Sequence, residues 1–261
     1  MEENPPQQTA PEQQQKKDFD LVLVPMEGVV AYWLSLSKLL GNARKVAKQV
    51  GEEAQYTSEP FIHHLLEVAF SDAPEPFVRR LGQAKRDALL DSLSRKLDLM
   101  RMSILDIVAA ENPRKTLAKM TAQYTFPPLN EEKAFRYVQD LAAMAEKDPA
   151  ERAEYFNVDH RLKVEQLIVV LLFYVLWSRR EGKRNLARFS KLITTPFYRD
   201  GLALVVDGFD GPFVRKRLQA HRQSILADVG MKMDASLEMA LAIRNRMEYE
   251  RVFEVGKSFM V

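Results

Sequence analysis

Apolar residues recur at steps of three and four positions along most of this chain. They form one continuous stripe over residues 76–107 and a second over residues 212–247. This spacing places apolar side chains on one face of a helix, whereas a strand would need a two-residue alternation. Residues 19–24 alternate, but imperfectly, and fit either a short strand or an extended arm. The pattern therefore predicts an all-α fold.

The helical pattern occurs twice. Residues 60–91 and residues 196–227 align without a gap, at an offset of 136 positions (from Pro60 to Pro196). Identities at this offset include Pro60/Pro196, Phe61/Phe197, Pro76/Pro212, Phe77/Phe213, Val78/Val214, Arg79/Arg215, Gln83/Gln219, Arg86/Arg222, Lys96/Lys232 and Asp98/Asp234. A match held in register over this length predicts two tandem copies of one unit.

Each copy is predicted to contain three helices. The first covers about residues 25–50 in one copy and 161–192 in the other. Pro60 and Pro196 then begin a short helix, and Pro76 and Pro212 begin a long one. Proline suits the first turn of a helix because its missing N–H would have no helical partner there.

The segments outside the copies have their own composition. Residues 1–17 are rich in Gln and Pro, which predicts a disordered tail because they offer little apolar surface to bury. Residues 113–160 form a linker, in which the Pro-Pro pair after Phe126 breaks any helix. Asn130 then caps a predicted bridging helix. The predicted domains are the tail 1–17, repeat 18–112, linker 113–160 and repeat 161–261.

The longest apolar run covers residues 167–177 and contains no charge. A helix of this length spans roughly 16 Å, about half of the ~30 Å hydrocarbon core of a membrane. We therefore interpret the run as the central helix of a soluble domain, with a membrane-dipping segment as the alternative. Because the tail lacks an apolar signal region, we expect a cytoplasmic protein without a transmembrane segment.

Candidate chemistry is sparse. The chain has no cysteine, and His63, His64, His160 and His221 show no metal-binding spacing, so we interpret them as surface residues. It also lacks a glycine-rich phosphate loop and a serine nucleophile motif. We therefore expect no enzymatic activity, no metal and no cofactor. The methionines of the second copy fit either core packing or a partner groove.

Clusters of basic residues are the one sequence feature that indicates a function. The strongest clusters lie in the second copy, and the candidate partner-binding residues are Arg179, Arg180, Lys183, Arg184, Arg215, Lys216 and Arg217. Three interpretations stay open: a solvated helical face, docking on an acidic protein surface, or phosphate binding. Of the two functional interpretations, phosphate binding in the form of nucleic-acid binding is the weaker, because few aromatic residues accompany the charges.

The second copy resembles the cytoplasmic domain of the flagellar stator subunit MotA, of the MotA/TolQ/ExbB family. The residues that carry the resemblance are Ser178-Arg179-Arg180-Glu181-Gly182, Pro196-Phe197, Gly201-Leu202-Ala203-Leu204-Val205-Val206-Asp207-Gly208 and Val214-Arg215. The first copy would be a diverged unit of the same kind. The resemblance implies contact with a stator, rotor or basal-body component, at the inner membrane through a motor complex.

The chain departs from that family in two respects. It lacks the four membrane helices of the ion channel. The family's rotor contact pairs an arginine, which matches Arg179 here, with an acid whose position holds Ala187, and Ala43 stands at the arginine position of the first copy. The sequence thus predicts a non-enzymatic, MotA-like scaffold or adaptor of the flagellar motor. The alternative is a basic helical nucleic-acid-binding protein, and a homo-oligomer is left open.

Overall fold

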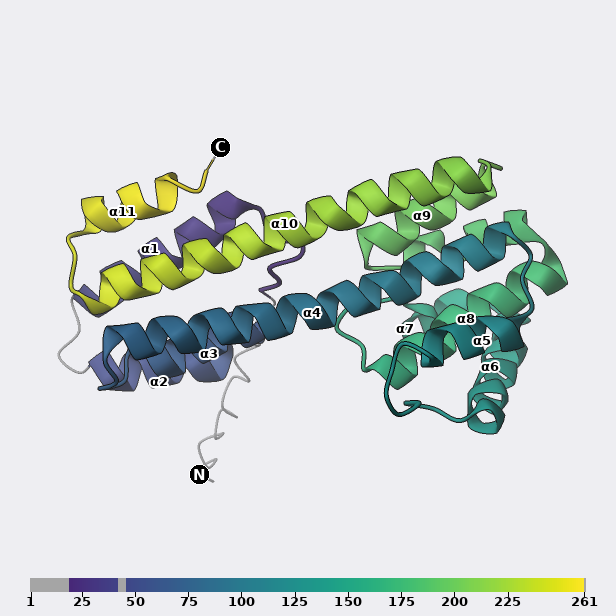
Figure 1. The fold of residues 1–261 in the computed structure, drawn as a ribbon, viewed down its shortest axis with the longest axis horizontal. Coiled ribbons are helices and arrows are strands. Elements are labelled where there is room, and N and C mark those ends of the chain that lie inside the picture. The colour runs from purple at the N-terminus through teal and green to yellow at the C-terminus, as the bar shows by residue number, and fades with distance from the viewer. Residues whose placement is uncertain (1–18, 42–45, 261) are drawn as a thin grey trace, which may run out of the picture. The chain divides into compact units, whose positions relative to one another are not determined.

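The computed structural model describes residues 19–41 and 46–260, and over these residues the chain consists of helices and connecting turns without a strand (Figure 1). The predicted all-α fold is confirmed. The predicted tail, residues 1–17, lies outside the described residues. Contacts divide the chain into two compact units: unit 1 comprises Met1–Asp87 with Val229–Val261, and unit 2 comprises Ala88–Asp228.

The division falls inside two long helices, α4 (Glu75–Val108) and α10 (Gly211–Arg244), each of 34 residues. Their first residues, like their last residues, lie 136 positions apart (Glu75 to Gly211). Each unit therefore takes residues from both predicted copies. The copies themselves, residues 18–112 and 161–261, stay a prediction about sequence duplication.

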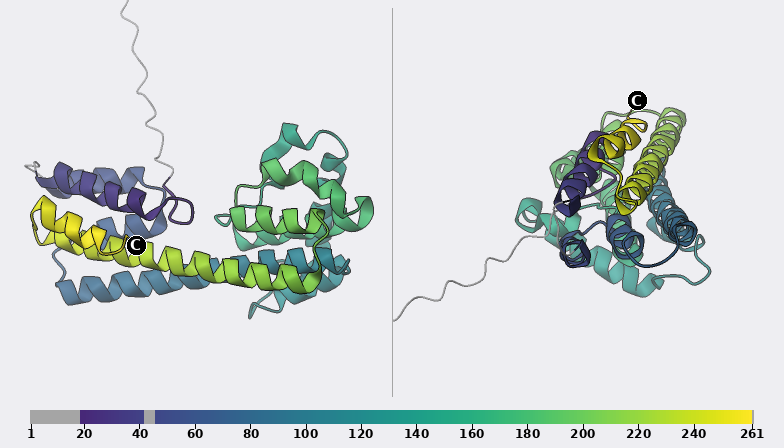
Figure 2. Two further views of the ribbon diagram at one scale, coloured as in Figure 1. Left: turned by 90° about the horizontal axis from the view of Figure 1, so that it is seen from above. Right: turned by 90° about the vertical axis from the view of Figure 1, so that its left-hand side faces the viewer.

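Unit 1 contains α1 (Met26–Gly41), α2 (Val46–Tyr56), α3 (Pro60–Ala69) and α11 (Tyr249–Lys257), together with the start of α4 and the end of α10. The helix α11 lies beside α1 and the end of α10 (Figure 2). At Gly256 of α11 an added Cβ would lie 2.7 Å from Cγ1 of Val30 and 3.1 Å from Cε of Met239. Only glycine permits this close approach of α11.

The beginning of unit 1 differs from both predicted alternatives. Residues 19–24 form a turn, not a strand or an extended arm. Oδ1 of Asp20 accepts from the N–H of Val22 at 2.9 Å, and the carbonyl of Asp20 accepts from the N–H of Val24 at 2.8 Å. An aspartate side chain that bonds the backbone two residues ahead favours a turn over extended chain.

Unit 2 contains α5 (Pro113–Thr121), α6 (Glu131–Ala145), the 3-10 helix η1 (Pro149–Arg152), α7 (Ala153–Phe156), α8 (Val164–Glu181), the 3-10 helix η2 (Lys183–Leu192) and α9 (Pro196–Val206). The predicted central helix is confirmed, because α8 is buried from Leu171 to Val175. No helix within the described residues combines the length and apolarity needed to cross a membrane.

One prediction about a single helix needs correction. The helix predicted over residues 161–192 breaks at Gly182, whose φ of 85° lies in a region that other residues avoid, and η2 follows. The helix predicted over residues 25–50 corresponds to α1 and α2, with residues 42–45 outside the described part. The helix predicted after Asn130 is confirmed as α6, where Oδ1 of Asn130 accepts from the N–H of Lys133 at 2.8 Å, and its bridging role stays a prediction.

The ends of α4 and α10 use the same cap. Ala110 and Arg246, which are 136 positions apart (110 to 246), adopt left-handed conformations with φ of 51° and 53°. After α4 the N–H of Glu111 bonds the carbonyl of Asp106 at 2.9 Å, and after α10 the N–H of Met247 bonds that of Ala242 at 3.1 Å. This is the Schellman arrangement, which satisfies carbonyls that a helix end leaves unpaired.

The structure distinguishes the methionines that pack in the core from those that are exposed, and it shows how far the histidines are buried. Met233 and Met239 are buried in the core, whereas Met231 and Met247 are 44% and 42% exposed, so neither interpretation holds for all four. The histidines are not simple surface residues, because all four are half-buried. His221, for example, packs its ring 5.4 Å from that of Phe197.

Candidate protein interaction surface

The basic run 179–184 begins at the end of the buried helix α8. That end is held by an aromatic cluster: the ring of Phe173 lies 5.6 Å from that of Trp177 and 5.4 Å from that of Phe189 in η2. Nε1 of Trp177 donates to Oδ1 of Asn185 at 3.0 Å. The packing fixes the direction of the backbone on both sides of Gly182, and with it the directions of the basic side chains.

Arg179 and Lys183 are engaged with the end of α4. Nη1 of Arg179 donates to the carbonyl of Ala110 at 3.0 Å, and Nζ of Lys183 donates to the carbonyl of Val108 at 2.7 Å. Carbonyls at a helix C-terminus lack partners and carry partial negative charge. Both cations therefore cap α4, which gives them a structural role within unit 2.

Arg180 is engaged with an acidic partner. Its Nη2 lies 2.5 Å from Oε1 of Glu146, and its Nε lies 3.0 Å from Oε1 of Glu181. The hydrogen bond with Glu146 raises the pKa of Arg180 above its ordinary value. The guanidinium also lies 5.8 Å from the ring centroid of Trp177. Three of the seven predicted contact residues thus have contacts within the unit.

The remaining four predicted residues are exposed: Arg184 in η2, and Arg215, Lys216 and Arg217 in the second turn of α10. None of the four forms an ion pair with another described residue. We call Arg215, Lys216 and Arg217 the α10 triad. Their helix is capped by Asp210, whose Oδ1 accepts from the N–H of Phe213 at 2.8 Å.

Two exposed phenylalanines lie next to the α10 triad in sequence. Phe209 and Phe213 are each 45% exposed, and their rings stack with centroids 4.9 Å apart and an interplanar angle of 20°. Phenylalanine rings of this exposure leave apolar surface in contact with water, and a partner surface would bury it. The start of α10 thus combines free positive charge with apolar surface.

The corresponding part of α4 is different. Arg79, which aligns with Arg215, donates to Glu238 through Nη1 and Nη2, and its Nη2 also lies 3.5 Å from Oε1 of Glu75. The position that aligns with Glu75 holds Gly211, so Arg215 has no acid one turn before it. The sequence carried this signal, because an acid four residues before an arginine on a helix predicts an ion pair.

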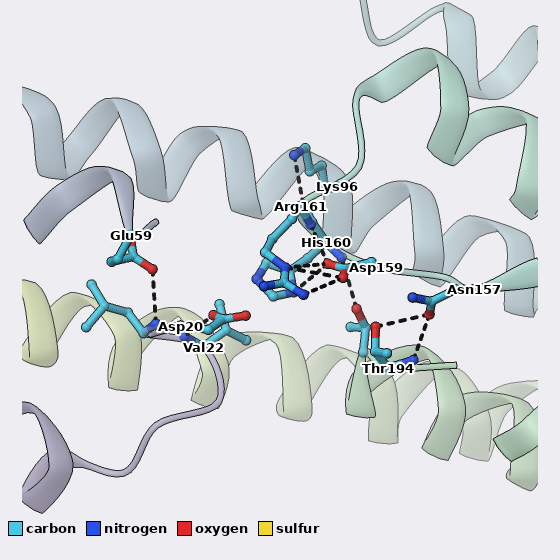
Figure 3. A network of polar contacts seen from close by, with 11 residues as sticks. Asp20, Val22, Glu59, Lys96, Asn157, Asp159, His160, Arg161 and Thr194 are labelled. Atoms are coloured by element: carbon cyan, nitrogen blue, oxygen red, sulfur yellow. Dashed lines mark hydrogen bonds and ion pairs between the residues drawn. The ribbon is translucent and has the colours of Figure 1, made fainter. Parts of the chain in front are cut away.

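A second polar cluster in unit 2 surrounds residues 157–161 (Figure 3). Asp159 accepts from the N–H of Arg161 at 2.8 Å, and Nζ of Lys96 donates to the carbonyl of His160 at 2.7 Å. Oδ1 of Asn157 accepts from the N–H of Thr194 at 2.9 Å. These bonds fix the segment before α8.

The unit 1 part of Figure 3 has a similar structural role. Oε2 of Glu59 accepts from the N–H of Leu21 at 3.2 Å, which ties the turn at Asp20 to the start of α3. Within the described residues, no three His, Asp or Glu side chains gather in a way that could hold a metal ion. The basic and aromatic surface at the start of α10 is therefore the best candidate site in the described chain.

Comparisons with protein-family models, with curated proteins and with solved structures find no match for this chain. A function therefore has to be inferred from the residues of the chain itself.

Proposed function

We propose that this chain is a non-enzymatic adaptor that docks on an acidic protein surface through the α10 triad and the adjacent phenylalanines. The observation that carries the proposal is the contrast among the basic residues. Arg179, Arg180 and Lys183 hold other parts of unit 2, whereas the α10 triad is exposed and unpaired within the described residues.

The chemistry of this surface suits a protein partner. Aromatic residues and arginine are enriched in protein interfaces and carry much of their binding energy. Three neighbouring cations speed the encounter with a surface of opposite charge and orient it. Phe209 and Phe213 would supply the apolar contact that charges alone lack.

The motif resemblance narrows the proposal to the flagellar motor. In that proposal the partner is a stator, rotor or basal-body protein with an acidic face, and the α10 triad replaces the rotor contact that Ala187 has lost. The chain would then act as a MotA-like scaffold that conducts no ions.

A co-purification from flagellated cells that express the tagged chain tests the proposal. The triple variant Arg215→Glu/Lys216→Glu/Arg217→Glu should lose the partner that the unmodified chain retains. The matched control is Arg152→Glu/Lys163→Glu/Lys191→Glu, which changes net charge equally at exposed residues away from α10, and it should retain the partner.

Two outcomes would contradict the proposal. Equal recovery of the partner by both triple variants would exclude the α10 triad as the contact. Recovery of a triad-dependent partner that is no motor component would exclude the motor. Binding of duplex DNA that falls steeply with salt would instead favour nucleic-acid binding, since released counterions make phosphate contacts salt-dependent.

A further inference from the structure

The helix α6 packs on α8, and the two helices leave a groove along one edge of their contact. Tyr137, Leu141 and Met144 of α6 border a groove of about 640 Å³, closed on the other side by Val169 and Val170 of α8. Tyr155 of α7 also borders it, and both tyrosines are exposed, at 41% and 49%.

The groove is elongated along α6. Its α6 lining runs from Lys133 through Tyr137 and Leu141 to Met144, at steps of four, four and three residues. These positions cover three turns of one helix face, about 16 Å along the axis. The lining from α8 includes Gln166 and Val170, again one turn apart. The α6 side of the groove is thus long enough to border about three turns of an added helix.

The charges around the groove are mostly negative. Asp140, Glu154 and Glu165 border it, with Lys133 as the one cation of the lining. None of the three carboxylates forms an ion pair with another residue in the described part of the chain, and Lys133 lies 5.9 Å from the ring centroid of Tyr137. An occupant with positive charge would therefore be favoured over a neutral or acidic one.

We propose that this groove binds an amphipathic helix that carries lysine or arginine beside its apolar stripe. Apolar side chains at positions i, i+4 and i+7 would pack on Tyr137, Met144 and Val169, as in other helix-in-groove complexes. The basic side chains would reach Asp140, Glu154 and Glu165. Met144 suits such a site, since methionine adapts its shape to a partner.

This inference goes beyond the docking of α10 on an acidic surface and does not depend on it. The groove takes a partner of the opposite charge, and no residue of α10 borders it. A chain with both sites joins an acidic partner to a basic one.

The experiment measures fluorescence anisotropy of labelled peptides titrated with the full chain. The probe is a Leu/Lys peptide of about 18 residues, five helical turns, with leucine at i, i+4 and i+7. A Leu/Glu peptide of the same pattern is its control. The Leu/Lys peptide should bind, and the Leu/Glu peptide should bind at least about tenfold more weakly.

Matched variants locate the binding. Asp140→Lys/Glu154→Lys should weaken the Leu/Lys peptide about tenfold, and Tyr137→Ala/Tyr155→Ala should weaken it similarly. The control Glu132→Lys/Glu151→Lys makes the same charge change at exposed residues outside the groove and should leave affinity within about twofold. Thermal unfolding of each variant verifies the fold.

A spectroscopic signal separates binding in the groove from binding elsewhere. The methyl resonance of Met144, assigned by loss of the peak in Met144→Leu, should shift on addition of the Leu/Lys peptide. Binding with no shift of this resonance, equal affinity for the two peptides, or equal loss in both charge-reversal variants would each overturn the proposal.

Discussion

The guanidinium of Arg222 in α10 holds the carboxylate of Asp98 in α4, with Nη2 of Arg222 and Oδ2 of Asp98 2.7 Å apart. The same Nη2 donates to Oγ of Ser94 at 2.6 Å. Both members of the ion pair are three-quarters buried, at 23% side-chain exposure each. Unit 1 repeats the arrangement at the aligned positions, where Nη2 of Arg86 donates to Oδ2 of Asp234 at 2.9 Å. Each unit thus joins its parts of α4 and α10 through one arginine–aspartate pair.

The pair in unit 2 should contribute measurably to stability. We expect Arg222→Ala to lower the free energy of unfolding by about 1–3 kcal/mol, because it leaves Asp98 partly buried without its partner. A double-mutant cycle with Asp98→Ala, measured by urea unfolding, gives the coupling energy of the pair. The exposed pair Lys48–Glu52 in α2 is the control, with an expected coupling of about 0.3–0.5 kcal/mol. Equal couplings would contradict the prediction.

Gly201 permits the close packing of α9 in unit 2. An added Cβ would lie 2.4 Å from Cδ1 of Ile104 and 2.9 Å from Cδ2 of Leu218. We expect Gly201→Ala to destabilise the protein by about 1–3 kcal/mol through overpacking. Ile104→Val removes the clashing Cδ1, so the double variant should lose less stability than the two single losses combined.

A glycine in open surroundings provides the control for this prediction. An added Cβ at Gly51, within α2, would meet no atom within 4 Å. Gly51→Ala should therefore stabilise the protein by up to about 1 kcal/mol through helix propensity. Thermal unfolding measures all four variants, and additive losses at Gly201 and Ile104 would refute the packing argument.

Cutting the linker should give two fragments that need each other. Phe126 is 83% exposed in a non-helical segment, so a cut between Phe126 and Pro127 breaks no helix. Because unit 1 needs α10 and α11, and unit 2 needs the end of α4 and α5, neither fragment contains a complete unit. We expect the tagged fragment 1–126 to retain fragment 127–261 after co-expression, and each alone to lack a cooperative unfolding transition. Independent folding of both fragments would instead support the repeats as the folding units.

Acid should weaken the protein through His221. Burial lowers the pKa of His221, and the charge of Arg217 lowers it further, while Asp200 opposes these effects. The folded protein therefore binds a proton less readily than the unfolded chain, whose histidine pKa is about 6.5. The stabilising contribution of the neutral ring is present above about pH 6.5 and is lost as the pH falls through the lower pKa of the folded state.

Urea unfolding at about pH 7.5 and pH 5.5, on either side of the ordinary histidine pKa, measures this effect. His221→Gln should show a smaller loss of stability between the two conditions than the unmodified chain. An unchanged loss would mean that other groups account for the pH dependence. His64, whose pKa is also lowered by burial, accounts for part of the remaining slope.

The sequence shows where the basic residues of the candidate site lie, but not which of them are engaged by other parts of the chain. The seven basic residues form clusters in the sequence, but the contacts that distinguish engaged from exposed residues come mainly from segments distant in sequence. Arg179 bonds the carbonyl of Ala110, and Arg180 pairs with Glu146. The pairing of Arg79 with Glu75 could be predicted from the sequence, because its partner lies one helical turn away. The charge environment of the groove along α6 likewise needs residues from three helices.

Features that depend on neighbouring residues could be predicted from the sequence. The three- and four-residue period gave the helices, Pro60 and Pro196 marked where α3 and α9 begin, and Asn130 marked the cap of α6. These interactions act within a turn or two of the chain, so local chemistry is sufficient to predict them. The turn at Asp20 and the break at Gly182 are also local, but their residues admit other conformations until packing selects one.

Tertiary structure alone decided which segments complete each unit. The end of α10 and α11 belong with α1 to α3, although about 150 residues or more separate them in the chain, and the end of α4 belongs with α8 and α9. The offset of the repeats does not predict which segments pack together. An apolar stripe shows that one face of a helix is buried, but not which segment covers it. The partner of a stripe is chosen by the fit of side chains such as Ile104 against Gly201, which exists only once the chain has folded.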